Sequence, residues 1–205
     1  IKSLKIYGVK KRTLHQDILK VINKNLSNKT SYNHLLRVAV NKKIVSVSLR
    51  KRVKPKLNFD LKLVNLNREE PQYKNLKYKK ILKYLTKMNN SKSDIGLVSK
   101  KKLLETGTSN LLFVKNDKFF TPIKDYYEGN TFKFFKNKIK KMIKKDIFVK
   151  DLKNYDEILL VGSGKGIASV KTVKQIGWKR KSLKHFKVLS KYYNSIIDKC
   201  APYRF

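Results

Sequence analysis

The sequence predicts an α+β fold in two domains, and three observations support this. Apolar residues recur at helical spacing in some segments and form short strand-like runs in others. The strand-like runs follow one another in hairpin-like pairs, which favours α+β over a doubly wound sheet. A polar stretch closed by a proline, residues 50–55, is the candidate linker between residues 1–52 and residues 53–205.

The first domain is predicted to hold one helix and a strand pair. Thr13 and Gln16 have capping-box spacing, and apolar residues then recur every three or four positions up to Leu26. The two strands expected after this helix span residues 35–40 and 45–49. We interpret these elements as the remnant of a small α/β domain.

The second domain is predicted to mix strands with three helices. The strands are expected at 57–63, 94–99, 111–114, 157–161 and 167–173, with a turn at Asn116-Asp117. The helices are expected over residues 78–88, 132–143 and 182–200.

The charge is extreme, at +37 from 51 basic and 14 acidic residues. A large positive charge attracts nucleic acid, so a basic nucleic-acid-binding protein is one hypothesis. However, 44 of the basic residues are lysines and seven are arginines, whereas base readout and bidentate phosphate contacts favour arginine. We therefore interpret the charge as AT-rich coding bias and expect no specific nucleic-acid partner.

Other classes of protein are disfavoured by what the sequence lacks. Its apolar runs are too short for a membrane span, and no signal peptide is evident, so we expect a cytoplasmic protein without a membrane partner. The lone Cys200 excludes an internal disulfide, and the three histidines show no metal-ligand spacing, so no metal is expected.

Two segments have the composition of anion cradles. Glu128-Gly129-Asn130-Thr131 precedes a predicted helix, whose first N–H groups can bind an anion, although the segment taken alone favours an ordinary helix cap. Gly162-Ser163-Gly164-Lys165-Gly166 follows a predicted strand. Its spacing fits neither G-x-G-x-x-G nor a P-loop, so a plain glycine turn stays an alternative.

Two further features of the sequence are an acidic residue, Glu105, and a lysine near a predicted helix, Lys74. Glu105 heads a short polar run between apolar strands, and acidic residues are scarce in this chain, so a buried carboxylate there needs a reason. Lys74 is expected to open the second predicted helix, but no feature of the residue itself distinguishes it among 44 lysines.

Four motifs follow one another along residues 71–175: Lys74-Asn75-Leu76-Lys77-Tyr78; Glu105 with Ser109-Asn110-Leu111; Thr121-Pro122 with Gly129-Asn130-Thr131; and Tyr155-Asp156-Glu157 with Gly162-Ser163 and Val170. In this order and spacing they resemble the motifs of the class IV aminotransferase superfamily, the fold-type IV pyridoxal-phosphate enzymes. The sequence departs from the usual pattern at Lys77, Asn130 and Ser169.

The resemblance implies a cofactor, pyridoxal 5'-phosphate, and a role for each matching residue. Lys74 would hold the cofactor covalently and move the proton at Cα, and Glu105 would bind the pyridine nitrogen. Tyr78 would bind the ring oxygen, while Asn130, Thr131 and Ser163 would hold the phosphate. Gly164 is a candidate for substrate binding.

The resemblance also implies a small-molecule amino substrate and a homodimer. Family members begin with a strand region and a His-x-x-Arg-Leu segment, and Ile1 is expected to start after it, so we expect an N-terminally truncated chain with an incomplete small domain. His34-Leu35-Leu36-Arg37 resembles that segment in letters, but it follows the first predicted helix and leads into a strand. At that place the family has a different arginine-bearing strand near the substrate, so the resemblance implies Arg37 as a candidate for binding a substrate carboxylate.

Three activities share this predicted fold. Branched-chain aminotransferases usually carry a glycine-rich stretch after the last phosphate loop, whereas Val173 is followed here by Lys174-Gln175-Ile176 and Gly177-Trp178. This absence favours aminodeoxychorismate lyase, an enzyme of p-aminobenzoate and folate synthesis. The alternative is a branched-chain or D-amino-acid aminotransferase.

Overall fold

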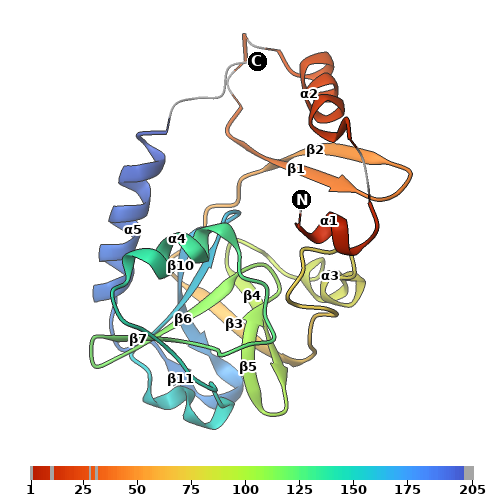
Figure 1. Cartoon of the computed structure of the whole chain (residues 1–205). Helices are drawn as coiled ribbons and strands as arrows, with labels where there is room; N and C mark the ends of the chain where they lie inside the picture. The colour runs from red at the N-terminus through yellow and green to blue at the C-terminus, as the bar shows by residue number, and fades with distance from the viewer. Residues whose placement is uncertain (1, 10–11, 28, 31, 201–205) are drawn as a thin grey trace. The chain divides into compact units, whose positions relative to one another are not determined.

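A computed structural model describes residues 2–9, 12–27, 29–30 and 32–200, which divide into two compact units (Figure 1). The first comprises the described residues up to Arg52 together with Cys200, and the second comprises Val53–Lys199. Ile1 and residues 201–205, the ends of the two predicted domains, lie outside the described residues. In the described part of the chain, no helix combines the length and apolar character needed to cross a bilayer.

The first unit contains helices α1 (Lys2–Ile6) and α2 (Leu14–Asn25) and the antiparallel hairpin of β1 (His34–Val40) and β2 (Val45–Lys51). Asn41 closes the hairpin, because its Oδ1 accepts hydrogen bonds from the backbone N–H groups of Lys43 and Ile44 at 2.8 and 2.7 Å. The predicted capping box is wrong: the Thr13 hydroxyl bonds to Asp17 at 3.3 Å and makes no cap hydrogen bond.

The second unit is built on one mixed sheet. Neighbouring strands of this sheet follow the order β5-β4-β3-β10-β9-β6-β7-β8, and β11 pairs with β10. The pairs β3/β4, β3/β10 and β7/β8 are parallel, and the others are antiparallel. The strands are β3 (Phe59–Asn65), β4 (Ser93–Ser99), β5 (Lys102–Thr106), β6 (Asn110–Lys115), β7 (Lys118–Thr121), β8 (Met142–Lys144), β9 (Glu157–Gly162), β10 (Gly166–Val173) and β11 (Trp178–Lys179).

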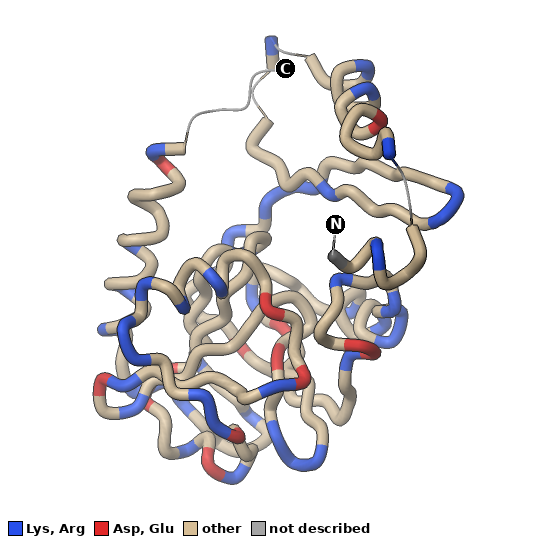
Figure 2. Tube along the Cα trace, in the orientation of Figure 1, with Lys and Arg blue, Asp and Glu red and all other residues tan. Residues whose placement is uncertain are grey.

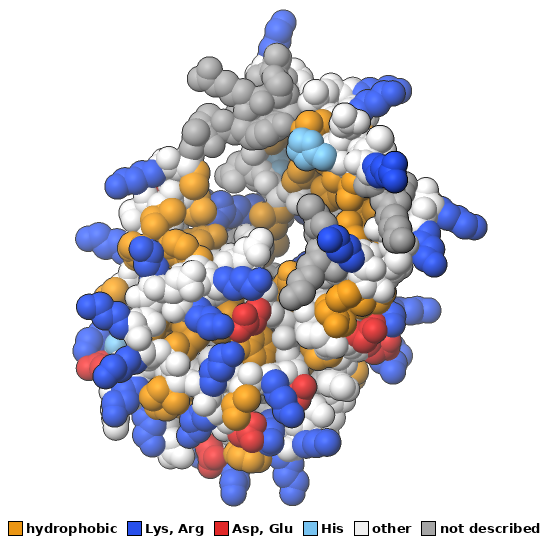
Figure 3. Space-filling view, viewed as in Figure 1, with side chains coloured by type: hydrophobic (Ala, Val, Ile, Leu, Met, Phe, Trp, Pro, Cys, Tyr) orange, Lys and Arg blue, Asp and Glu red, His pale blue; other side chains and the backbone are white. Residues whose placement is uncertain are grey.

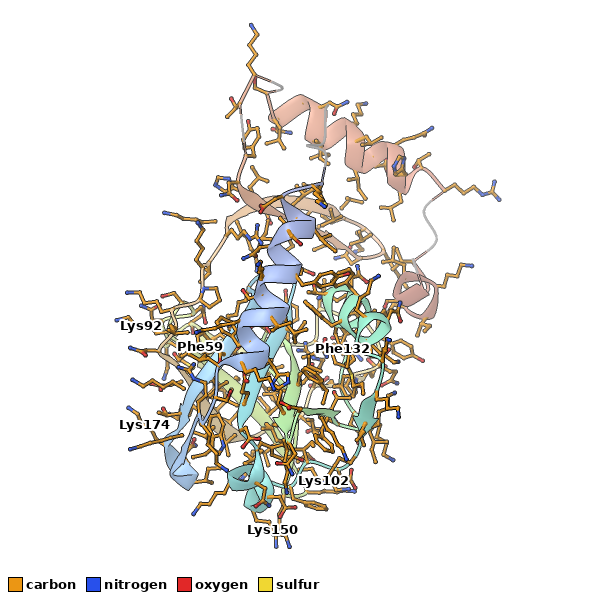
Figure 4. The ribbon with its side chains drawn as sticks, turned by 90° about the vertical axis from the view of Figure 1, so that its left-hand side faces the viewer. Phe59, Lys92, Lys102, Phe132, Lys150 and Lys174 are labelled. Atoms are coloured by element: carbon orange, nitrogen blue, oxygen red, sulfur yellow. The ribbon has the colours of Figure 1, made fainter. Side chains whose placement is uncertain are left out.

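Side chains of the central strands alternate between two apolar clusters, as the strand pleat requires. On one face, Leu160 of β9 joins a cluster that contains Phe59 and Trp178. On the other face, Leu159 and its neighbours pack against α4 (Asn130–Lys138), which contributes Phe132, and α5 (Lys184–Ile197). Figure 4 shows Phe59 and Phe132 pointing into the body of this unit. A smaller cluster lies beneath α3 (Lys79–Leu85).

Two helix predictions need correction. The second helix begins at Lys79, so Lys74 lies in the preceding loop and does not open a helix. The third helix ends at Lys138 and is followed by β8, which pairs with β7. The apolar residues at positions 139, 142 and 143 fit helical spacing, but a partner strand satisfies their backbone groups instead. Strand β5, which carries Glu105, was not predicted.

The basic residues are spread over the chain rather than gathered in one segment (Figure 2). On the face visible in Figure 3, Lys and Arg side chains are scattered among polar and apolar ones. The labelled Lys92, Lys102, Lys150 and Lys174 point outward from different sides of the second unit (Figure 4). This distribution differs from the single basic stripe expected of a dedicated nucleic-acid binder.

Candidate active site

Glu105 is the buried acid at one end of the candidate site. It lies on β5 opposite Leu97 of β4 and is 3% exposed. Arg68 donates to it from Nε to Oε1 at 2.8 Å, and Nη2 lies 3.5 Å from Oε2. Burial raises the pKa of Glu105, while the charge and hydrogen bond of Arg68, a backbone hydrogen bond from Tyr127 and the charge of Lys74 oppose that rise. Desolvation therefore favours the protonated form of Glu105, and Arg68 is the strongest group that favours the ionised form.

Lys74 lies on the exposed loop before α3, close enough for its charge to act on Glu105. Its Nζ is 5.0 Å from the centroid of the Tyr127 ring, a cation–π contact. Asn75 shapes this loop, because its side-chain amide donates to the Glu69 carbonyl at 2.8 Å and its Oδ1 accepts from the Lys77 N–H at 3.0 Å. These local bonds explain why the helix begins after this loop rather than at Lys74.

Asn110 connects this end of the site to the start of α4. Its side-chain amide donates to the Tyr127 carbonyl at 2.6 Å, and its Oδ1 accepts from the Gly129 N–H at 3.1 Å. A Cβ on Gly129 would lie 3.2 Å from that oxygen, so the backbone approaches closely here. Asn110 thereby fixes the segment that presents Tyr127 to Lys74 and leads into the helix.

The two predicted anion cradles meet at the other end of the site. Thr131 is buried in the first turn of α4, and its hydroxyl lies 3.1 Å from the hydroxyl of Ser163 in the turn between β9 and β10. Asn130 is the first residue of α4 and is exposed, and Gly164 lies half-buried beside Ser163. Two hydroxyls at a helix N-terminus suit a phosphate, because the first-turn N–H groups have no intrahelical acceptor.

Tyr78 and Arg37 are the two remaining predicted site residues. Tyr78 lies at the N-cap of α3 and packs against the apolar cluster that contains Ile81 and Leu85. Arg37 lies on β1 of the first unit, opposite Ser48. The functional roles of Tyr78 and Arg37 stay predictions.

Sequence reasoning missed Arg68 and the role of Asn110. Arg68 is one of seven arginines and lies six residues before Lys74, so its rarity was a usable signal. Asn110 belongs to one of the four motifs, but the sequence assigned no role to this residue. Its partners lie 17 and 19 residues away, where no local pattern points to them.

Comparison with known proteins places this geometry in a family. The family model described as amino-transferase class IV matches residues 1–173. The chain belongs to the class IV aminotransferases. The predicted family, fold class and pyridoxal-phosphate-dependent enzyme class are therefore confirmed.

Several solved structures share the fold of this class IV chain. A putative 4-amino-4-deoxychorismate lyase from Legionella pneumophila has a TM-score of 0.71 at 16% identity, covering 95% of this chain and 81% of that one. A branched-chain aminotransferase from Thermoproteus uzoniensis has a TM-score of 0.69 at 14% identity, covering 96% and 75%. A Brucella abortus aminotransferase bound to pyridoxal phosphate has a TM-score of 0.68 at 15% identity, covering 94% and 80%. No curated protein sequence matches the chain.

Proposed function

We propose that this class IV protein is an aminodeoxychorismate lyase that holds pyridoxal phosphate on Lys74. The observation that carries the assignment is the single segment 127–131. At one end, Tyr127 contacts Lys74 and bonds to Glu105, and at the other, Thr131 meets Ser163. A lysine amine, a buried carboxylate and a pair of hydroxyls are the groups needed for an aldehyde, a pyridine nitrogen and a phosphate.

Bound pyridoxal phosphate supplies an electron-withdrawing ring that stabilises negative charge at the substrate carbon attached to nitrogen. Glu105 would accept a hydrogen bond from the protonated ring nitrogen and keep that proton in place. Arg68 favours the ionised form of Glu105 that this bond requires. Thr131 and Ser163 would donate hydroxyl hydrogen bonds to phosphate oxygens.

Lys74 is the group that moves the proton. Its amine would take the proton from the substrate carbon attached to nitrogen, and the bond between the ring and the enolpyruvyl oxygen would break. The leaving enolpyruvate would take up a proton at its methylene carbon and become pyruvate. The ring that remains becomes aromatic p-aminobenzoate, and this aromatisation drives the elimination. Lys74 is exposed on the loop that precedes α3.

The lyase is favoured over a transaminase by the chain after β10. Residues Lys174–Ile176 form one 3-10 turn, Gly177 adopts a left-handed conformation at φ 64°, and β11 then returns to pair with β10. The segment is thus a tight hairpin turn and not a glycine-rich phosphate or substrate loop. A branched-chain or D-amino-acid aminotransferase is the second candidate, supported by the Thermoproteus structure of the same fold.

Trapping the cofactor on the protein tests the assignment of Lys74. Borohydride reduction in the presence of pyridoxal phosphate should label Lys74, as read by peptide mapping. Lys74→Ala should lose both the label and the visible absorbance of the bound cofactor, whereas the neighbouring Lys77→Ala should keep them. A label on another lysine would end the assignment.

An acceptor requirement separates the two reactions. A lyase regenerates its starting form in each turnover, so the protein should form pyruvate and p-aminobenzoate from aminodeoxychorismate without 2-oxoglutarate. A transaminase alternates between two forms and needs an amino acceptor. Rapid transamination of leucine, with bleaching of the visible band by leucine alone, would instead identify a branched-chain aminotransferase.

We further propose that the enzyme serves folate synthesis in the cytoplasm as a homodimer, as the sequence resemblance implies. Light scattering of the purified protein measures the dimer directly. A monomer at all accessible concentrations would contradict that part of the proposal.

A further inference from the structure

Asp94 is a second buried carboxylate, on β4, and it is fully shielded from solvent. Its Oδ1 accepts a hydrogen bond from the Ile95 N–H at 2.8 Å. Its Oδ2 accepts from the hydroxyls of Thr106 at 3.1 Å and Thr108 at 2.5 Å. Asp94 therefore holds the loop that follows Glu105 on the chain.

Lys165 supplies the fourth donor to Asp94. Its Nζ lies 2.7 Å from Oδ2 and 3.0 Å from the Thr108 hydroxyl, and its side chain is 5% exposed. The ammonium also lies 5.0 Å from the centroid of the buried Phe59 ring. Almost all lysines of a protein keep their charge in water, so a buried lysine with this set of partners needs a specific role.

The position of Lys165 connects it to the phosphate end of the site. Lys165 lies two residues after Ser163 in the turn between β9 and β10, and its N–H donates to the Gly162 carbonyl at 3.1 Å. A Cβ on Gly162 would come within 2.9 Å of the Ser109 hydroxyl and 3.2 Å of the Thr108 carbonyl. The turn therefore lies directly against the loop that Asp94 holds.

The contacts close into a ring around the site. Asp94 holds the loop at Thr106 and Thr108, and two residues later Asn110 holds Gly129 at the start of α4. Thr131 of α4 meets Ser163, and the same turn returns through Lys165 to Asp94. Glu105 precedes Thr106, so one ring joins the acid at one end of the site to the hydroxyls at the other.

We propose that Lys165 is a positioning residue that fixes the phosphate-binding turn relative to Glu105. The inference rests on the proposed function. In pyridoxal phosphate a short –CH2–O– link joins the phosphate to a rigid ring, so the pyridine nitrogen and the phosphate can meet Glu105 and Ser163 only over a narrow range of separations. The ion pair with Asp94 sets that separation by anchoring the turn to the loop after Glu105. Lys165 itself touches neither the phosphate nor the reacting atoms.

Comparing pyridoxal phosphate with pyridoxal, which lacks the phosphate, tests this role on the full chain. Lys165→Met should weaken pyridoxal phosphate binding about tenfold and pyridoxal binding by less than about twofold, as read from visible absorbance titrations. Lys165→Arg should recover most of the difference, because arginine keeps the charge. Lys102→Met is the matched control, since Lys102 pairs with Asp146 at 2.6 Å outside the ring, and it should change neither constant.

A double variant guards against misfolding, because Lys165→Met alone leaves Asp94 buried without its counterion. Lys165→Met with Asp94→Asn removes both charges and should show the same loss specific to the phosphate form. Equal weakening of both ligands, or binding as in the wild type, would overturn the positioning role while leaving the proposed function intact. If the wild-type protein formed no visible complex with pyridoxal phosphate, the proposed function itself would fall, and this inference with it.

Discussion

Glu105 and Asp94 are buried carboxylates on neighbouring strands, and their surroundings differ sharply. Asp94 receives four donors, as many as an ionised carboxylate has lone-pair sites: Ile95 on Oδ1, and Thr106, Thr108 and Lys165 on Oδ2. Glu105 has Arg68 at 2.8 Å on one oxygen, a marginal 3.5 Å contact on the other and a backbone hydrogen bond from Tyr127.

The difference teaches how a binding acid is distinguished from a structural one. A carboxylate whose acceptor sites are filled can gain nothing from a ligand, so its work is to hold the protein together. A carboxylate with acceptor capacity left over, and with its pKa raised by burial, is prepared for a donor that arrives with a ligand. The predictions below test this division between Asp94 and Glu105.

Truncation of Asp94 should have the largest effect on stability. Asp94→Ala leaves Lys165 buried without its counterion, which should cost about 3–5 kcal/mol of unfolding free energy. Urea denaturation followed by circular dichroism measures this cost. A loss below about 1 kcal/mol would show that the ring around Asp94 is not structural.

Neutralisation of Glu105 should act on turnover instead. Glu105→Gln keeps the shape of the side chain but cannot hold the ring nitrogen in its charged form, so turnover should fall about 10²–10³-fold. The cofactor should still bind, because Lys74 and the hydroxyls remain, but more weakly than in the wild type. Steady-state assays with a visible spectrum of the same sample decide this, and near-normal turnover with a normal spectrum would give Glu105 another role.

The sequence was sufficient for most of the sheet of the second unit. Strands β6, β9 and β10 are short apolar runs bounded by turn residues, a pattern that predicts buried strands. By contrast, β5 begins with Lys102 and is short, so only its pairing with β4 identifies it as a strand. The apolar spacing of β8 suits a helix equally well, and the contact with β7 decides the outcome.

The site shows the same limit. Glu105, Thr131 and Ser163 were found from the scarcity of acids, a helix start and a glycine turn, which are local signals. Arg68 and Lys165 act through partners 37 and 71 residues away, so no local pattern reveals these pairings. Among the lysines whose burial the structure describes, Lys165 is distinguished by being buried, and this is visible only in the folded chain.

Loss of Arg68, the counterion of Glu105, should shift the pH dependence of pyridoxal phosphate binding. Burial already raises the pKa of Glu105 and Arg68 opposes that rise, so Arg68→Met should raise it further. Below its pKa the carboxyl is protonated and uncharged, so it is a weaker partner for a protonated ring nitrogen. The acid limb of pyridoxal phosphate binding should therefore move to higher pH.

A matched variant controls for the loss of a positive charge. Lys184→Met removes the exposed ion pair with Asp117 and should leave the acid limb of cofactor binding in place. An unshifted limb in Arg68→Met would mean that ionisation of Glu105 does not control binding.

The smallest expected effect comes from one of the four donors to Asp94. Thr108→Val keeps the side-chain shape but removes the hydroxyl that donates to Asp94 at 2.5 Å and accepts from Lys165 at 3.0 Å. Three donors to Asp94 remain and Thr108 is exposed, so the cost should be about 1 kcal/mol of unfolding free energy. The pH at which cofactor binding is lost on the acid side should not change, because these two hydrogen bonds join Thr108 to Asp94 and Lys165 and not to Glu105. Urea denaturation and the same pH titration test both expectations, and a shifted limb with unchanged stability would reverse the division between the two carboxylates.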